Sequence, residues 1–198
     1  MLSRHNIRIK VFQTLYAYHQ SDHTNTAVAE KDYLRAVEES YRLYLFNLLY
    51  LIEVASYSKV DYDIKSKKFI PTEADKKASL KLYRNPILVA LRDNEAYHSL
   101  TRKKKLRGMI DSDLVRTLYQ KFAKSEYYQS YLEMDPTPPR EHQYCLVNLY
   151  KSMLEEELFL DHLEDISPTS EDDQSLIFGA IKRSIRSLPE NDDFLEAL

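Results

Sequence analysis

The residues best suited to chemistry stand at the start of the chain. Arg4 and Arg8 lie one helical turn apart, His5 adjoins the first of them, and Lys10 projects in another direction. A guanidinium group binds phosphate through two parallel hydrogen bonds and stacks on bases, so two of them on one helix suit an RNA strand. The alternative is a fraying terminus whose charges serve no ligand.

A second cationic segment, Arg102–Arg107, has five cations in six residues and offers another contact for a nucleic-acid backbone. Gly108 follows it directly. Cations are favourable near the C-terminus of a helix, and glycine commonly ends one. We therefore interpret this segment first as a helix end closed by Gly108.

The sequence has no pattern typical of a catalytic or metal site. Its carboxylates occur in runs such as Glu155–Glu157 and Glu171–Asp173, which are typical of solvated faces and helix starts and not of an acid–base pair in a cleft. His19 and His23 stand four residues apart, but His23 falls in a polar segment, and we interpret the histidines as surface residues. With two glycines, the chain has no phosphate-cradling loop. We expect no enzyme activity, no metal and no cofactor.

Charge is unevenly distributed along the chain. The net charge is −3, but residues 155–198 hold 13 acidic and 3 basic side chains, a local net of −10. Residues 1–154 therefore carry a net charge of +7. This asymmetry predicts an anionic partner at the N-terminal part and not at the C-terminal part.

Cysteine use and hydropathy bear on the compartment. The single cysteine, Cys145, cannot form an internal disulfide and lies in an apolar stretch, which favours a buried thiol in a reducing compartment. The N-terminus lacks the apolar run of a signal peptide, and the most apolar stretch, Leu43–Val54, is too short and too polar to span a bilayer. We expect a cytoplasmic protein with no membrane segment.

The spacing of apolar residues predicts an all-α fold. A first helix is expected over residues 6–19, and a helix that is apolar on two sides usually packs between others. Its two apolar faces consist of Ile7, Val11, Leu15 and Tyr18, and of Ile9, Phe12 and Tyr16.

A long amphipathic second helix is expected from residue 26 to about residue 57, capped by Asn25 or Thr26. Its apolar residues recur in alternating steps of three and four, which is typical of the seam of a helical bundle. We expect this helix to form the centre of the core. The seam consists of Leu34, Val37, Tyr41, Tyr44, Leu48, Leu51 and Ala55.

The rest of the chain is expected to add shorter helices after a lysine-rich loop over residues 58–71. The clearest break is Asp135–Pro139. Helix starts are indicated at Thr72, at Asn85–Pro86, at Asp111 or Ser112, and at Thr169 or Ser170. The predicted organisation is a pair of N-terminal helices over 1–57, a helical insertion over 58–135, and a helical segment with an acidic tail over 136–198.

Sixteen tyrosines fall mostly on or beside the predicted inner faces, as Tyr41 and Tyr44 do. A tyrosine ring packs in a core while its hydroxyl finds a polar partner, and a tyrosine on a surface stacks on bases. We favour core packing for most of them.

The first helix resembles that of the NusB family of transcription antitermination factors. In that family two adjacent basic residues are followed, after two positions, by an arginine and then by a Gln-x-Leu-aromatic ending. His5 stands where the family usually has a second arginine, which weakens the positive charge at that position. The matching positions are Arg4, His5, Arg8, Gln13, Leu15 and Tyr16. The resemblance implies that RNA is bound by Arg4, His5, Arg8, Lys10, Gln13 and Tyr16.

The long second helix and the Tyr- and Lys-rich middle resemble the extended form of the family, in which an insertion follows the opening helices. The resemblance implies an all-helical protein that binds the boxA element of nascent ribosomal RNA together with the ribosomal protein NusE. It also implies that the protein helps the RNA polymerase elongation complex to read through terminators. The resemblance is fairly specific over residues 1–57 and only general beyond them.

One departure concerns the C-terminal half of the family. That half contains an Asn-Glu pair and a Phe-[Ile/Val]-Asn-Gly-type motif, which Phe178-Gly179-Ala180 does not match. We expect either a truncated chain that lacks this half or an atypical protein. Loss of this half would expose apolar surface that favours a homodimer.

Two alternatives stay open beside RNA binding. In the first, the helix over 26–57 docks other proteins as a scaffold, without RNA. In the second, the chain is a regulatory domain of an enzyme. NusB-like folds also occur fused to RNA methyltransferases, which suggests this alternative. The few cations of the first helix give a salt slope of only about −2 to −3 on single-stranded RNA, at ~0.7 per phosphate, so selectivity is expected to need a partner protein.

Overall fold

The computed structural model describes residues 4–21, 25–188, 190 and 195, apart from the side chains of Ala74 and Lys76. The chain is all-α, as predicted, and no strand occurs within these ranges. The elements are α1 (Arg4–Gln20), α2 (Thr26–Ser66), α3 (Glu73–Lys76), α4 (Pro86–Arg92), α5 (Glu95–Lys103), the 3₁₀ turn η1 (Leu106–Met109), α6 (Ser112–Ala123), α7 (Glu126–Glu133), α8 (Pro139–Leu154), α9 (Glu157–Ile166) and α10 (Ser170–Ser187).

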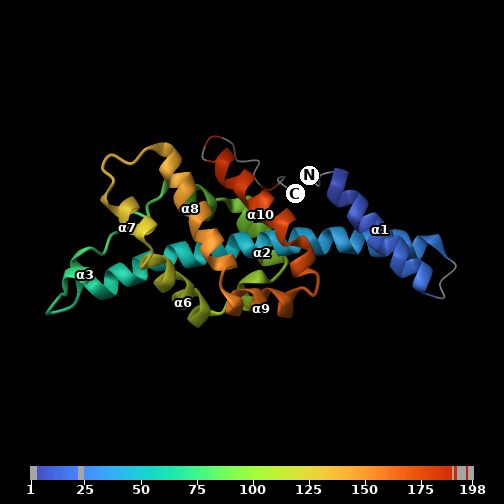
Figure 1. Cartoon of the computed structure of the whole chain (residues 1–198), viewed down its shortest axis with the longest axis horizontal. Coiled ribbons are helices and arrows are strands. Elements are labelled where there is room, and N and C mark those ends of the chain that lie inside the picture. The colour runs from blue at the N-terminus through green and yellow to red at the C-terminus, as the bar shows by residue number, and fades with distance from the viewer. Residues whose placement is uncertain (1–3, 22–24, 189, 191–194, 196–198) are drawn as a thin grey trace.

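The long helix α2 is the axis of the molecule, and Figure 1 shows it running along the whole length. The helices α6, α8 and α10 pack around its middle, while α1 lies beside its first part only. Every residue of Leu43–Ile52 is buried, so this part of α2 is covered on all sides. The predicted role of α2 as the centre of the core is confirmed.

Side-chain caps set the starts of several helices, as predicted. The Asn25 side chain accepts a hydrogen bond from the Ala27 amide at 2.9 Å at the start of α2. Asn85 caps α4, followed by proline at its first position, and Asp111 caps α6. Most of the predicted acidic tail, from residue 189 on, lies outside the described residues.

The loop predicted over residues 58–71 is wrong for its first part, because α2 continues to Ser66. Three interactions extend it. The Ser58 hydroxyl donates to the Ala55 carbonyl at 2.6 Å, Lys65 pairs with Asp61 at 2.7 Å, and the Tyr57 ring packs on Tyr119 of α6. The spacing of apolar residues does not indicate this last part of α2, because side-chain bonds and a ring contact stabilise it.

The cationic segment 102–107 ends α5, but the chain does not turn at Gly108 as expected. Lys105 adopts the left-handed conformation, with φ of 54°, and Gly108 lies within η1. Lys104 contacts Glu38 and lies over the Tyr41 ring, so the segment bends toward α2.

The three predicted segments share one core. The predicted boundary at residue 57 falls inside α2, and the buried cluster includes Leu48, Leu118 and Ile181, one from each segment. The helix α7, which the sequence did not predict, adds the buried rings of Tyr128 and Tyr131 to this core.

Tyrosine hydroxyls within the core have polar partners, which confirms the packing role predicted for most of them. Tyr44 bonds Ser184 at 2.6 Å, and Tyr150 donates to the Asn47 side chain at 3.0 Å. Cys145 is fully buried on α8, and burial raises the pKa of its thiol. None of the described helices combines the length and the apolarity that crossing a bilayer requires.

Replacing Leu48 with alanine tests the central part of α2. Leu48 is fully buried, so Leu48→Ala should lower the free energy of unfolding by about 2–5 kcal/mol in urea denaturation. Leu34 belongs to the same seam but is 58% exposed, so Leu34→Ala should change it by about 0.5 kcal/mol or less. Equal losses for the two variants would contradict this packing.

Candidate nucleic-acid interface

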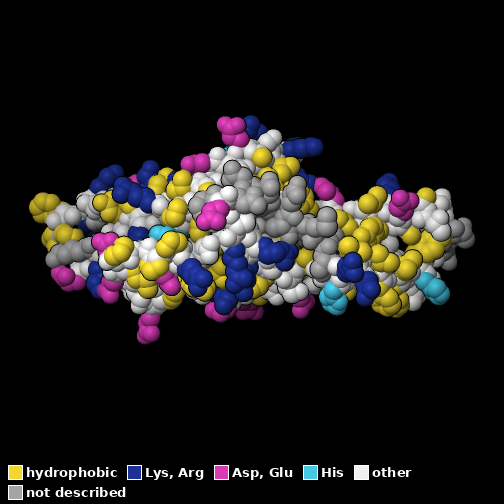
Figure 2. Space-filling view, turned by 90° about the horizontal axis from the view of Figure 1, so that it is seen from above, with side chains coloured by type: hydrophobic (Ala, Val, Ile, Leu, Met, Phe, Trp, Pro, Cys, Tyr) yellow, Lys and Arg dark blue, Asp and Glu magenta, His cyan; other side chains and the backbone are white. Residues whose placement is uncertain are grey.

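The helix α1 is the most exposed element of the molecule. It was expected to pack between other helices, but it lies at one end, mainly against α2. Phe12 is 69% exposed, Tyr16 59% and Leu15 56%. Figure 2 shows hydrophobic side chains, with cations and histidines beside them, over the end of the molecule that α1 and the start of α2 form. The two-sided apolar pattern of α1 therefore corresponds to apolar side chains that remain exposed.

The outer face of α1 combines cations with aromatic rings. Arg4, Arg8, Phe12 and Tyr16 follow one another at intervals of four residues, so they form one slowly turning stripe, and all four are exposed. The rings of Phe12 and Tyr16 stack with centroids 6.4 Å apart and 22° between their planes. The exposed imidazole of His5 belongs to the same side by helical spacing.

Lys10 does not belong to this exposed face, although it was predicted to contact RNA. Its side chain is 5% exposed, and Nζ lies 3.0 Å from Oδ1 and 3.1 Å from Oδ2 of Asp173 on α10. The Ser40 hydroxyl of α2 donates to the same carboxylate at 2.6 Å. As a correction, we assign Lys10 to the junction between α1 and the body, because a paired and buried ammonium does not reach a phosphate.

Gln13 lies between these two environments. It is exposed, and its Nε2 donates to Asp172 at 3.3 Å. The acidic first turn of α10 thus faces the inner side of α1, where its negative charge is unfavourable for an anion. Of the six predicted RNA contacts, the structure gathers Arg4, His5, Arg8 and Tyr16 on the outer side.

The residues that the sequence did not single out here are Phe12, Ser40 and Asp173. Phe12 was assigned to a buried face, although its spacing of four from Arg8 and from Tyr16 places it in the exposed stripe. The contact of Asp173 with Lys10 spans 163 positions, so no local signal in the sequence indicates it.

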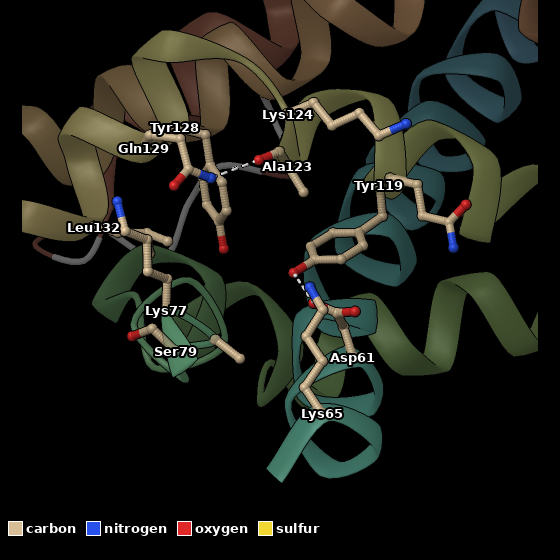
Figure 3. Close-up of a pocket in the computed structure, with 12 residues that line it drawn as sticks. Asp61, Lys65, Lys77, Ser79, Tyr119, Ala123, Lys124, Tyr128, Gln129 and Leu132 are labelled. Carbon is tan, nitrogen blue, oxygen red and sulfur yellow. Dashed lines mark hydrogen bonds and ion pairs between the residues drawn. The ribbon is translucent and has the colours of Figure 1, made fainter. Parts of the chain in front are cut away.

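Another cleft lies at the far end of α2, between α2, α6 and α7 (Figure 3). Its volume is about 590 Å³. Tyr119 directs its hydroxyl to Asp61, donating at 3.2 Å, and Lys65 pairs with the same carboxylate at 2.7 Å. Burial raises the pKa of the Tyr119 hydroxyl well above its usual range, so it stays protonated near neutral pH.

The described polar side chains of this cleft are mainly hydrogen-bond donors. Lys77 and Lys124 line it, and Gln129 at its edge donates to the Ala123 carbonyl at 2.7 Å. Among the described lining residues Asp61 is the one carboxylate, and it is already paired. The cleft therefore lacks the two differing carboxyl groups of an acid–base pair.

The histidines are distributed over the molecule. His5 and His19 are exposed, whereas His98, His142 and His162 are half-buried, which corrects the expectation of surface histidines, and His23 lies outside the described residues. His142 accepts or donates at 3.0 Å with the Tyr131 hydroxyl, and burial lowers its pKa. Within the described part of the chain no three potential metal ligands converge.

No family model, curated protein or solved structure matches this chain.

Breaking the pair between Lys10 and Asp173 should destabilise the protein strongly. Lys10→Met leaves a buried carboxylate without its cation, so the free energy of unfolding should fall by about 3–5 kcal/mol in urea denaturation. The matched control is Arg35→Met, which breaks an exposed pair with Asp32 and should cost about 1 kcal/mol or less.

A double variant tests whether the loss comes from the unpaired charge of Asp173 or from the changed shape of the side chains. Lys10→Met combined with Asp173→Leu removes both charges and should recover much of the loss, since an apolar pair of similar volume replaces a buried ion pair with little cost. Losses that match between Lys10→Met and Arg35→Met would show that the junction is not buried in solution.

Proposed function

We propose that this chain is a NusB-like RNA-binding factor that takes part in transcription antitermination and has no catalytic activity of its own. It binds boxA-type sequences of nascent ribosomal RNA together with NusE and acts on the RNA polymerase elongation complex. Its compartment is the cytoplasm, where nascent RNA lies and the lone thiol of Cys145 stays reduced.

The observation that carries this proposal is the outer face of α1. Arg4 and Arg8 supply guanidinium groups for phosphates, and the next two turns supply the exposed rings of Phe12 and Tyr16. Single-stranded RNA is held by this combination, since cations follow the backbone while bases stack on aromatic side chains. The sequence motif of the first helix agrees with this use.

The apolar side chains around this stripe support a protein partner at the same helix. Ile9 is 42% exposed and Leu15 56%, and both adjoin the stripe by helical spacing. A partner that covers them would also enclose the RNA and add the selectivity that two arginines do not provide. We propose that NusE is the partner that covers these side chains.

Variants of α1 test RNA binding directly. Arg4→Ala with Arg8→Ala should weaken binding of a labelled boxA-type RNA and reduce the salt slope by about 1.4, because two phosphate contacts are lost at ~0.7 each. Phe12→Ala with Tyr16→Ala should weaken binding by about 1–3 kcal/mol per stacked base and leave the slope nearly unchanged. Fluorescence anisotropy at several salt concentrations, with and without NusE, measures both quantities.

The matched control for the arginine variant is Arg84→Ala with Arg116→Ala. Both control residues are exposed arginines away from α1, so the same charge is removed at another place. RNA affinity that falls equally in the two double variants, or in neither, would refute specific recognition by α1.

A second candidate function is that of a helical scaffold that binds other proteins without RNA. The exposed apolar side chains of α1 favour it, because contiguous apolar surface on a folded protein usually marks an interface. As a scaffold, the protein would use α1 to form a homodimer or to bind a different protein.

Light scattering at low and high salt distinguishes the scaffold from the RNA factor. An assembly through apolar contacts should persist at high salt and should weaken in Ile9→Ser with Leu15→Ser, whereas counterion release makes RNA complexes dissociate. The control is Val60→Ser with Ile64→Ser, two exposed apolar residues at the far end of α2. An assembly that only the control disrupts would exclude α1 as its interface.

A further inference from the structure

A second cationic surface lies between α8 and α10, apart from α1. It is a cleft of about 400 Å³. In Figure 2 several Lys and Arg side chains gather over the middle of the molecule, where α8 and α10 lie in Figure 1. Four cations line the cleft, namely Arg140 and Lys151 of α8 and Lys182 and Arg186 of α10.

The packing of the two helices fixes this arrangement. Gln143, near the start of α8, donates to the Arg186 carbonyl near the end of α10 at 3.3 Å. Further along α8, the Tyr150 ring stacks on Phe178 in the middle of α10, with centroids 6.0 Å apart and 12° between the planes. The helices therefore run antiparallel, and each contributes two cations to the lining of the cleft.

None of the four cations is neutralised by a carboxylate among the described residues. The described side chains that line the cleft include no Asp or Glu. Glu141, the neighbour of Arg140, accepts a hydrogen bond from the Tyr127 hydroxyl at 3.4 Å on α7. Four cations around one cleft repel each other, so an anion that binds there relieves the repulsion.

An aromatic side chain lies among these cations. Tyr144 is 47% exposed and stands one turn after Arg140 on α8, and Val147 and Lys151 continue the same face. The amides of Gln143 and Asn148 also line the cleft and suit base edges or ribose hydroxyls. A flat ring between cations, with amides beside it, is the composition of a platform for single-stranded nucleic acid.

We propose that the cleft between α8 and α10 is a second site for a strand of RNA, with phosphates on the four cations and a base on Tyr144. This inference rests on the proposed RNA-binding function and extends it to the part of the chain where the charge asymmetry predicted no anionic partner. Lys182 and Arg186 belong to that acidic segment but face Arg140 and Lys151 across the cleft. An acidic protein segment is the competing occupant, and the ring of Tyr144 favours the nucleotide.

The test uses the full chain and a fluorescein-labelled single-stranded RNA of about 16 nucleotides, the upper end of common site sizes. Lys182→Gln with Arg186→Gln should weaken binding roughly tenfold at about 50 mM salt and reduce the salt slope by about 1.4. Arg84→Gln with Arg116→Gln removes two exposed cations elsewhere and should change neither quantity. Tyr144→Ala should weaken binding, Tyr144→Phe should not, and 4-thiouridine RNA should crosslink to the peptide that contains Tyr144.

The outcomes separate this inference from the proposed function. We call Lys182→Gln with Arg186→Gln the cleft variant. If Arg4→Ala with Arg8→Ala weakens RNA binding and the cleft variant does not, the cleft is no RNA site and the role of α1 stands. If the cleft variant alone weakens binding, the cleft is supported and the role of α1 fails. If the cleft variant loses binding of polyglutamate but not of RNA, the cleft belongs to an acidic protein partner and the inference is overturned.

Discussion

The arrangement of the exposed surface depends on one buried carboxylate. Asp173, at the start of α10, accepts hydrogen bonds from Lys10 of α1 and Ser40 of α2, so three helices meet at one side chain. A buried charge is tolerated only when it is paired, and this pair fixes which side of α1 turns inward. The arginines and the stacked aromatic rings face outward as a result. The polar junction thereby orients the proposed RNA-binding face.

Helix starts could be predicted from the sequence because a cap is a local interaction. Asn25, Asn85 and Asp111 each bond amides two or three positions ahead, so their effect lies within one short window of sequence. The apolar seam in the middle of α2 is equally local, since spacing alone places those residues on one face. Confirmed predictions of this kind fix the fold class and the centre of the core.

The surfaces could not be predicted in the same way, since they depend on pairs far apart in the chain. An apolar pattern does not distinguish a helix buried by its own fold from a helix left open to a partner, so α1 was misjudged. Lys10 resembles Arg8 in charge, and only the contact with Asp173 shows that it is buried and paired. Likewise, cations that suit the end of α10 as an isolated helix acquire a second role when α8 brings Arg140 and Lys151 opposite them.

The lone cysteine has a practical consequence for studying these helices. Cys145 lies on α8 directly after Tyr144, but its side chain points into the packed interior and the burial suppresses its thiolate form. An alkylating reagent can react with it only while α8 is detached from its neighbours. Since the chain has no other thiol, the rate of alkylation reports the opening of this region without any introduced probe. Cys145 thus reports local unfolding of α8, one residue away from Tyr144 in the cationic cleft.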